Sequence, residues 1–427
     1  MKINELRNAI ESGELDARFV ELYSADTVQA QRERYLAAIE SFCELFGAER
    51  DAHVYSVSGR SELAGNHTDH NCGKVIAASI NLDIIAVVAQ NGTSKINLKS
   101  EGYNLLSVDY NEYSEPKSRH FGTSASLIAG MCRGFTDNGY SVGGFDAYCT
   151  SSVLRGSGLS SSAAFEVMVG NVLNHEFNGG SVSNVEIAKL AQYAENVFFG
   201  KPCGLMDQVA CAHGGIVAID FEDTKAPIIE KIDFDLTAAG YNLCIVDTGG
   251  NHADLTDDYA AVPAEMKSVA AYLGKRVLRE CEPSDVLANA KEIRTGCGDR
   301  ALMRAIHFLR ENERVDAMKE ALKRGELEVY FAGVRESGLS SFCYLQNVYT
   351  TKNVSEQGLS LALCITERFM QGNKGSFRVH GGGFAGTIQA YIAEEDVELY
   401  RQTMDAVFGE GACLVLRIRR DGAIKVI

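Results

Sequence analysis

The segment "LRGSGLSSSAAFEVMVGNVL", residues 154–173, decides the fold that we expect for this chain. Its glycines at 156 and 158 precede three serines, and small and apolar residues at helical spacing follow. Glycine lets backbone N–H groups approach a ligand closely, and the first turn of a helix presents unpaired N–H groups and the positive end of the helix dipole. The segment therefore predicts a phosphate-binding loop that opens a helix.

A simpler interpretation is that Ser160 only caps the helix after a flexible turn, which is a common role of serine. Three consecutive serines behind two glycines exceed what a cap needs, so we favour phosphate binding. The chain contains no G-x-x-x-x-G-K-[ST] pattern, so the loop is not of the Walker A type.

The residues on both sides of this loop predict an α+β protein. Before it, the patterns indicate helices at 28–47 and 122–138 and strands at 53–59, 74–90 and 144–152. After it, Ser183 and Glu186 form a capping box ahead of a helix that ends at Gly200. In the later half we expect strands at 214–220, 241–249, 386–393 and 413–420, and helices near 263–273, 315–324, 355–371 and 394–408.

The length of 427 residues exceeds the size at which one hydrophobic core usually stops growing. We therefore expect two lobes, residues 1–215 and 216–427, with the functional site in the cleft between them. The chain shows no internal repeat and no low-complexity stretch.

The segment "GRSELAGNHTDHNCGK", residues 59–74, is rich in polar side chains between two predicted strands. A metal site is one interpretation, but the order H-x-D-H-x-C matches none of the usual zinc spacings. Ordinary polar loop residues are a second. The third is hydroxyl recognition, because carboxylates and imidazoles accept or donate hydrogen bonds in fixed directions, as stereospecific sugar binding requires.

Two further segments carry candidate functional residues. In "RVHGGGFAGTIQAYI", glycines at 381–383 and 386 lie between two predicted strands, which indicates a tight hairpin or, with the first loop, a bipartite nucleotide site. In "AENVFFGKPCGLMDQVACAHGG", Glu195 is followed by a Gly and Pro break and by Asp207 and Gln208. Phosphoryl transfer to a hydroxyl needs an acceptor for that hydroxyl, a Mg²⁺ ligand and a cation, and Asp207, Glu195 and Arg60 are of these types.

The composition limits the partners and the location. With 41 basic and 57 acidic side chains the net charge is -16, which would repel a nucleic-acid backbone or an anionic membrane. No apolar run reaches membrane-spanning length, and the N-terminus does not read as a secretory signal. The 12 cysteines contain no C-x-x-C pair, so we expect reduced and mostly buried thiols in a cytoplasmic protein.

In this order and at these separations, the three glycine-rich segments resemble the motifs of the GHMP kinase superfamily, and their details resemble the galactokinase family. The galactokinase signature reads roughly G-R-x-N-L-x-G-E-H-T-D-Y-N-G-G, and its second motif, G-x-G-L-S-S-S-A-A, is intact at 156–164. The resemblance spans about residues 50–390 and includes "CGLMDQ" around Asp207, "VDTGGNHADLTDDY" at 246–259 and "GGGFAG" at 381–386.

The resemblance implies a two-lobed fold, with a ribosomal-protein-S5-like N-terminal lobe and a GHMP C-terminal lobe. It also implies a sugar kinase that uses ATP and Mg²⁺ and phosphorylates the anomeric hydroxyl of a galactose-type sugar. Arg60 and Asp207 would be the catalytic pair: Asp207 would orient or deprotonate the hydroxyl, and Arg60 would keep it ionised and stabilise the phosphoryl group.

The same resemblance assigns binding roles by matched position. The ATP phosphates would be bound by Gly156, Ser157, Gly158, Leu159, Ser160, Ser161 and Ser162. Mg²⁺ would lie near Ser161 or Ser162 and Glu195. The sugar would be lined by Asn66, His67, Asp69, Gly204 and Tyr259.

The chain departs from the family pattern in the sugar pocket. Asn66 stands where the signature has Glu, His70 where it has Tyr, and Glu62 where it has Asn, while Asn251 replaces an Arg. These changes are compatible with galactose, with galacturonate, or with a pentose or amino sugar, and the H-x-D-H run also resembles plant galacturonate kinases. We expect galactose first and galacturonate second. Some galactokinase-like proteins are non-catalytic sugar sensors, but the retained serines, Arg60 and Asp207 favour an enzyme.

Overall fold

The computed structural model describes residues 1–112, 115–116, 118–153, 158–201, 203–250, 255–372 and 374–427. Its first sheet has eight strands with a path β12-β1-β2-β5-β3-β4, and β6 and β7 extend it beside β2. The strands are β1 (His53–Ala64), β2 (Lys74–Gln90), β3 (Lys95–Ser100), β4 (Leu106–Asp109), β5 (Phe145–Ser151), β6 (Ile216–Asp220), β7 (Ile228–Ile232) and β12 (Ala423–Lys425). Only β3 and β5 pair in parallel within the described part of this sheet.

Strand β2 is the centre of this sheet because both of its faces are covered. Ile85 and Val87 pack against the N-terminal helices, whereas Ala86 and Val88 point to the core on the opposite face. A strand buried on both faces is expected to be an almost continuous apolar run, as the sequence of residues 74–90 is.

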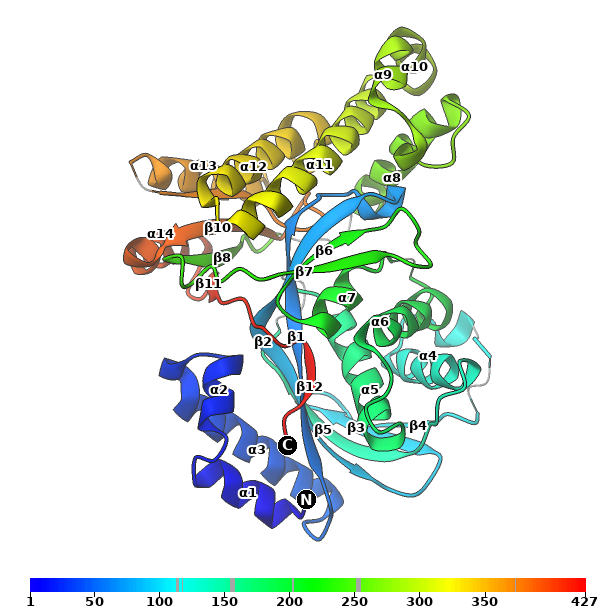
Figure 1. Ribbon diagram of the computed structural model, residues 1–427, viewed down its shortest axis with the longest axis vertical. Coiled ribbons are helices and arrows are strands. Elements are labelled where there is room, and N and C mark those ends of the chain that lie inside the picture. The colour runs from blue at the N-terminus through cyan, green and yellow to red at the C-terminus, as the bar shows by residue number, and fades with distance from the viewer. Residues whose placement is uncertain (113–114, 117, 154–157, 202, 251–254, 373) are drawn as a thin grey trace.

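Helices cover the two faces of the first sheet, as Figure 1 shows. On one face lie α1 (Ile3–Glu11), α2 (Asp16–Leu22) and α3 (Val28–Phe46). On the other lie α4 (Ser124–Asp137), α5 (Ser161–Phe177), α6 (Asn184–Tyr193) and α7 (Met206–His213). Two of the segments that the sequence singled out, the phosphate loop and residues 194–215, belong to this second group, so this face of the sheet carries part of the candidate site.

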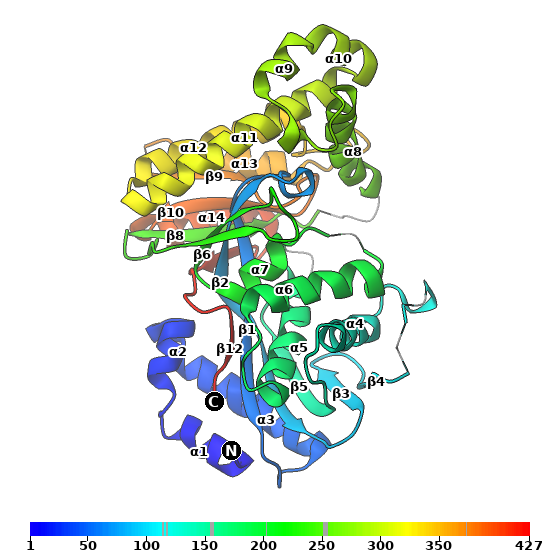
Figure 2. The ribbon, with the colours of Figure 1, turned by 45° about the vertical axis from the view of Figure 1, so that its right-hand side comes forward.

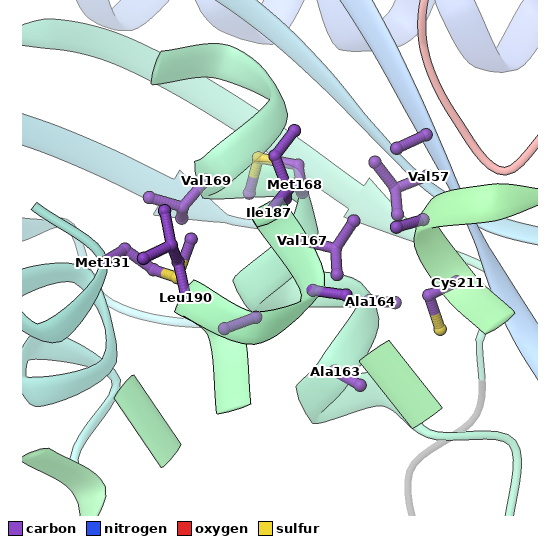
Figure 3. Close-up of a cluster of buried hydrophobic side chains, with 14 of the residues drawn as sticks. Val57, Met131, Ala163, Ala164, Val167, Met168, Val169, Ile187, Leu190 and Cys211 are labelled. Carbon is purple, nitrogen blue, oxygen red and sulfur yellow. The ribbon is translucent and has the colours of Figure 1, made fainter. Parts of the chain in front are cut away.

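Close packing of α5 depends on its small residues. A Cβ at Gly170 would lie 2.7 Å from Met131 Cε and 2.8 Å from Ile187 Cγ2, so only glycine lets α4 and α6 approach α5 at this point. Figure 3 shows Ala163, Ala164 and Val167 of α5 beside the side chains of the neighbouring elements. The run of small residues after the serines therefore serves to pack this helix tightly into the core.

The second sheet has four strands in the order β11-β8-β10-β9, all antiparallel. They are β8 (Tyr241–Asp247), β9 (Gly375–Val379), β10 (Thr387–Ala393) and β11 (Cys413–Leu416). One face packs on α13 (Gly358–Met370) and α14 (Val397–Phe408), and the other on α11 (Asp299–Arg324) and α12 (Leu327–Ser340). Helices α8 (Thr256–Tyr272), α9 (Pro283–Ala288) and α10 (Ala290–Cys297) project from one end of this layer in Figures 1 and 2.

The chain returns to the first sheet at its C-terminal end. After β11, Ile418 forms a bridge with Ile80, and β12 then pairs with β1, with Ala423 opposite Val57. The expected strand at 413–420 is therefore shorter than predicted, because it ends at Leu416 where the chain crosses from one sheet to the other.

Other predicted elements agree in type and differ in their ends. The helix expected at 315–324 is the last part of α11, which begins at Asp299, and the helix expected at 263–273 begins at Thr256 and contains Pro263. One half of the capping box predicted at Ser183 is confirmed, since its side chain accepts from Glu186 N over 3.2 Å. The first half of α11 was not predicted because its buried face includes polar residues, which interrupt the apolar pattern of a helix.

The division into lobes at residue 215 stays a prediction. Strands β6 and β7 follow that residue but belong to the first sheet, because β6 pairs with β2 and β7 pairs with β6. We therefore place the proposed boundary between Ile232 and Tyr241, where the chain passes to the second sheet. Within the described residues, no helix combines the length and the apolar character that crossing a membrane requires.

Candidate functional site

Arg60 and Asp207 form an ion pair at the base of the site. Arg60 lies on β1 beside a register shift of the β1–β2 ladder, and Asp207 lies in the first turn of α7. The Nε of Arg60 donates to Asp207 Oδ1 over 2.8 Å, while the Asp207 side chain keeps 33% of its surface exposed. Buried Arg60 therefore holds Asp207 in place, while the Asp207 carboxylate can still contact a ligand.

The protonation state of Asp207 follows from its neighbours. Burial by itself would raise its pKa, but the charge of Arg60 and hydrogen bonds from Arg60 and Ser160 hold the pKa below its usual value. Asp207 is therefore ionised at neutral pH and is ready to accept a hydrogen bond.

The predicted phosphate loop runs directly beside this pair. Arg60 NH1 donates to the carbonyl of Gly158, and Arg60 N donates to Leu159 O over 3.2 Å. Ser160 has a φ of +59° and donates from its hydroxyl to Asp207 Oδ2, and it makes no side-chain cap to α5. The interpretation of Ser160 as a simple helix cap is therefore wrong. Gly156 and Ser157 lie outside the described residues.

Ser161 and Ser162 occupy the first turn of α5, whose N-terminus opens beside Asp207. Both serines are partly exposed. An anion here would meet the positive end of the helix dipole.

Glu195 lies in a π-helical turn, Ala194–Phe199, that continues α6. It is 2% exposed, its Oε2 accepts from Gln208 Nε2 over 2.9 Å, and its Oε1 accepts from Lys201 Nζ over 3.1 Å. Such turns frequently mark functional positions, because the extra residue re-aims the side chains that follow.

Glu166 is a site neighbour that sequence reasoning missed. It is fully buried on α5, and burial first and the charge of Glu195 second raise its pKa well above the usual value. Its Oε2 lies 3.4 Å from Gln208 Nε2. A lone glutamate in the run of small and apolar residues after the serines was the available signal.

The turn at residues 65–71, which we call the signature turn, has an unusual backbone. Gly65 has a φ of +92°, and a Cβ there would overlap the carbonyl of Lys74, so glycine is required. His67 also has a positive φ, +59°, which is rare for a residue with a side chain. Thr68 closes the turn with a hydrogen bond from Oγ1 to Gly65 O over 2.9 Å.

His67 and His70 are linked within this turn. The Nε2 of His67 donates to Gly382 O at 2.8 Å, and its Nδ1 lies 3.2 Å from His70 Nε2. Burial is the main cause that lowers the pKa of both imidazoles, and that of His70 falls well below its usual value. Both rings are therefore neutral at neutral pH.

Asp69 and Gly204 lie against each other beside Asp207. A Cβ at Gly204 would overlap the carboxylate of Asp69, so this close approach requires glycine. Burial, followed by the charges of Asp207 and Glu62, raises the pKa of Asp69 to about 6. The structure thus brings together Asp69 and Gly204, which were predicted to bind the sugar, and Asp207, which was predicted to be catalytic.

Asn66 is placed differently from its partly exposed neighbours. It is 0% exposed, and its Nδ2 donates to Glu62 Oε1 over 3.1 Å and to Gly381 O over 2.6 Å. Its Oδ1 accepts from Asn347 Nδ2 over 2.8 Å and Ser341 Oγ over 3.2 Å. An amide makes two bonds at each end, so this side chain is satisfied inside the protein, and its contact with a sugar stays a prediction that this packing does not favour.

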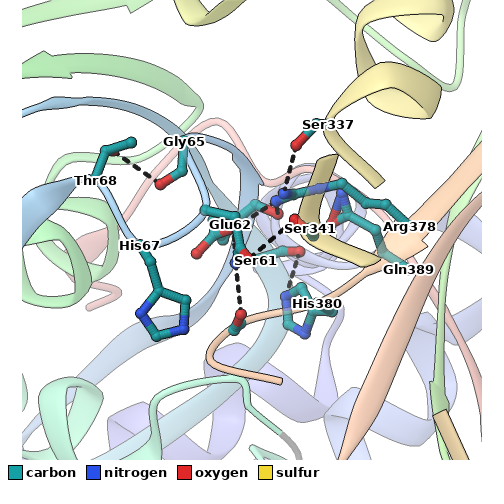
Figure 4. A network of polar contacts seen from close by, with 12 residues as sticks. Ser61, Glu62, Gly65, His67, Thr68, Ser337, Ser341, Arg378, His380 and Gln389 are labelled. Carbon is teal, nitrogen blue, oxygen red and sulfur yellow. Dashed lines mark hydrogen bonds and ion pairs between the residues drawn. The ribbon is translucent and has the colours of Figure 1, made fainter. Parts of the chain in front are cut away.

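A buried ion pair lies behind Asn66. Arg378 of β9 is 0% exposed and donates from NH2 to Glu62 Oε1 over 2.5 Å. Figure 4 shows Glu62, Arg378 and Ser337 converging from separate elements beside the signature turn. The signature departure at residue 62 therefore has its own partner in the second sheet.

The late glycine loop contacts both the signature turn and the phosphate loop. It connects the antiparallel strands β9 and β10, as the hairpin interpretation predicted. The carbonyls of Gly381 and Gly382 accept from Asn66 and His67, and that of Gly383 accepts from the Tyr259 hydroxyl over 2.6 Å. At its base, a Cβ on Gly158 would lie 3.2 Å from Thr387 Oγ1, so the same hairpin also contacts the phosphate loop.

Sequence profiles of two families match the chain. The profile described as "GHMP kinases N terminal domain" matches residues 126–215, and that described as "Galactokinase galactose-binding signature" matches residues 40–90. The first contains Asp207 and the phosphate loop, and the second contains Arg60 and the signature turn.

Whole-chain comparisons agree with these matches. A galactokinase of Thermotoga neapolitana is 30% identical over 332 residues, which cover 77% of this chain and 86% of the relative. A galactokinase of Streptomyces coelicolor is 29% identical, with 89% and 94% covered.

The fold agrees as well. The crystal structure of Lactococcus lactis galactokinase complexed with galactose superposes with a TM-score of 0.76 at 24% identity, with 92% of this chain and 100% of that chain covered. A mevalonate kinase structure gives 0.61 at 16% identity, with 86% and 99% covered. The two-lobed GHMP kinase fold expected from the motifs is therefore confirmed, and the chain belongs to the galactokinase family of the GHMP kinase superfamily.

Proposed function

We propose that this protein transfers the γ-phosphoryl group of ATP to the anomeric (C1) hydroxyl of galactose and forms galactose 1-phosphate and ADP. The observation that carries the proposal is the Arg60–Asp207 pair, which lies between the phosphate loop and the Asp69–Gly204 contact. An ionised carboxylate at that point can serve a hydroxyl on one side and a phosphoryl group on the other.

Asp207 acts on the attacking hydroxyl. Its exposed carboxylate accepts the hydrogen bond of the C1 hydroxyl, which orients the oxygen toward the γ-phosphorus. As the new O–P bond forms and the bond between the γ-phosphorus and the bridging oxygen of ADP breaks, the hydroxyl proton passes to Asp207. Arg60 holds Asp207 ionised beforehand and stabilises the charge on the transferring group.

ATP phosphates would lie at the N-terminus of α5. The N–H groups of the loop and first helical turn and the hydroxyls of Ser161 and Ser162 are donors of the kind that phosphate oxygens accept. The carbonyl of Gly158 accepts a hydrogen bond from Arg60, which keeps the loop at the catalytic pair.

The residues fit a Mg²⁺ ion with few protein ligands. Glu195 offers a carboxylate oxygen that already holds a cationic group, the Lys201 ammonium, and Ser162 offers a hydroxyl at the start of α5. Within the described residues, no group of three or more His, Cys, Asp or Glu side chains is arranged to hold a metal. This suits Mg²⁺, which usually takes one or two protein oxygens and completes its shell with water and phosphates. When bound, it would neutralise charge on the β- and γ-phosphates.

The pocket favours a sugar with an uncharged C6 group. Galacturonate would require a positive partner for its carboxylate, but His67 and His70 are held neutral by burial. Asp69, within the signature turn, adds negative charge when ionised and would repel a second carboxylate. Galactose is therefore favoured over galacturonate. A cytoplasmic location is part of the proposal, because ATP is used and the 12 cysteines are free thiols.

The test is ADP release with ATP and a panel of galactose, galacturonate, N-acetylgalactosamine, galactosamine, L-arabinose and glucose, with kcat/KM for each. Galactose should lead the panel. A leading galacturonate or amino sugar would overturn the substrate, and no turnover with any sugar would favour a sensor.

An Asp207→Asn variant completes this experiment. It should remain folded and keep its sugar affinity, and it should lose turnover. Full activity in a folded Asp207→Asn protein would overturn the role of Asp207.

A further inference from the structure

Helix α11 crosses the back of the signature turn and presents two buried polar side chains to it. His307 and Glu311 are both 0% exposed. They are separated by about one helical turn, so they lie on the same face of α11. Neither residue belongs to the glycine-rich segments, and both are more than 240 positions from the turn that they contact.

Glu311 binds the N–H groups at the start of the turn. Its Oε1 accepts from Gly65 N over 3.2 Å and from Asn66 N over 3.3 Å. The same oxygen accepts from Ser337 Oγ over 2.6 Å, and the other oxygen pairs with Arg314. Burial would raise the pKa of Glu311, but His307, Arg314 and Arg378 hold it below its usual value, so the carboxylate is ionised.

His307 binds the carbonyl of the same turn. Its Nε2 lies 3.0 Å from Asn66 O, which can only accept, so this nitrogen carries the proton. The other nitrogen, Nδ1, accepts from Ser340 Oγ over 2.8 Å. Burial lowers the pKa of His307 to about 4, so the ring stays neutral and this tautomer is kept.

The turn needs such support because of its backbone. Gly65 and His67 both have positive φ values, and for a residue with a side chain this conformation is sparsely populated and persists only where the surroundings enforce it. His67 and Asp69, which are partly exposed, follow within this turn. A small rotation of the peptide between Gly65 and Asn66 would therefore move both side chains.

We propose that Glu311 and His307 are positioning residues that hold the signature turn by three backbone hydrogen bonds and thereby set His67 and Asp69 for sugar binding. They act through the turn and do not touch the substrate. The inference rests on the proposed function, because its consequence is read in the affinity for galactose.

The test compares matched variants at both residues. Glu311→Gln keeps an accepting oxygen and Glu311→Ala removes it. His307→Gln keeps an N–H near the position of Nε2 and His307→Leu removes it. Glu313→Gln, on the exposed side of the same helix, is the control. For each, the thermal unfolding midpoint, kcat, KM for galactose and ATP, and the dissociation constant for galactose by calorimetry are measured.

We expect Glu311→Ala and His307→Leu to raise the galactose dissociation constant and KM by about tenfold, with the ATP KM within about twofold of wild type. The conservative Gln variants should keep most of the wild-type affinity for galactose. If Glu311→Ala does not fold, the His307 pair decides.

Two results would overturn the proposal. Galactose affinity within twofold of wild type in folded His307→Leu would exclude positioning, and an equal loss of galactose and ATP affinity would show only a structural role. Both are distinct from failure of the proposed function, in which the wild-type protein itself would neither bind nor phosphorylate galactose.

Discussion

The Nδ2 atom of Asn66 donates to Oε1 of Glu62 over 3.1 Å, so two of the residues that depart from the family signature contact each other. Where the signature has Asn at the first position and Glu at the second, this chain has Glu62 and Asn66. The carboxylate has exchanged places with the amide, and at its new position it pairs with the buried Arg378.

This contact predicts strong coupling between residues 62 and 66. Glu62→Asn leaves Arg378 buried without its carboxylate and should destabilise the fold by about 3–5 kcal/mol. Asn66→Glu places a second carboxylate against Glu62 and should also destabilise it. The double variant Glu62→Asn/Asn66→Glu should be more stable than the sum of the two single effects predicts, by at least about 2 kcal/mol of unfolding free energy measured in urea. Additive effects of the two changes would contradict an exchanged pair.

The Asp69–Gly204 approach predicts a selective loss of sugar affinity. In Gly204→Ala the new Cβ would overlap the Asp69 carboxylate and push it away from the pocket. The KM for galactose should rise by about tenfold or more, and the KM for ATP should change little. Gly296→Ala is the matched control, because its Cβ would lie 3.6 Å from Tyr272, an ordinary contact. Equal galactose KM values in the two variants would exclude this role.

The raised pKa of Asp69 predicts a pH dependence of sugar binding. Because this pKa is about 6, the carboxylate becomes a full acceptor only as the pH rises through that value. The KM for galactose should therefore fall between pH 5 and pH 7, and Asp69→Asn should remove the change.

The same shift also affects stability. The folded-state pKa lies above the unfolded value of about 3.8, so the contribution of Asp69 to stability is present below the unfolded value and is lost as the pH rises through about 6. Unfolding free energies of wild type and Asp69→Asn should diverge over this window. Parallel curves would mean that Asp69 titrates at its ordinary pKa.

The surroundings of Glu166 and Glu195 predict that amide substitution affects magnesium-dependent activity strongly at Glu195 and weakly at Glu166. Glu195→Gln removes a charged oxygen ligand, so the Mg²⁺ concentration for half-maximal activity should rise by about tenfold or more. Burial first and the charge of Glu195 second raise the pKa of Glu166 well above its usual value, so we expect Glu166→Gln to change activity by less than about threefold. A magnesium titration of both variants checks this. Equal responses would mean that Glu195 is no metal ligand.

The motifs of the site were readable from the sequence because each is a short continuous segment with its own chemistry. The glycines and serines at 156–162, the signature at 59–74 and the carboxylates of residues 194–215 predicted the fold family. The structure brings Arg60 beside Asp207 and Asp69 beside Gly204, and the roles that the resemblance implied for these residues stay predictions.

The role of Asn66 could not be predicted in this way. Its position in the signature indicated a sugar ligand. However, all hydrogen bonds of its side-chain amide are made to residues from other elements, Asn347 and Gly381 among them. Which side of a turn faces the substrate depends on what packs behind it, and no local pattern records that.

The sequence alone was enough to predict four strands of the first sheet, β1, β2, β5 and β6, and the helix that follows the serines, because periodicity and glycine placement act over neighbouring residues. It gave no signal for the short strands β3, β4, β7 and β12. Three features became visible only in the folded chain. Helix α11 supports the signature turn, the carbonyl of Gly382 in the late glycine hairpin accepts a hydrogen bond from His67 of that turn, and the C-terminal strand β12 returns to pair with β1. These contacts join residues hundreds of positions apart, and they are selected by burial of the whole chain rather than by any single segment.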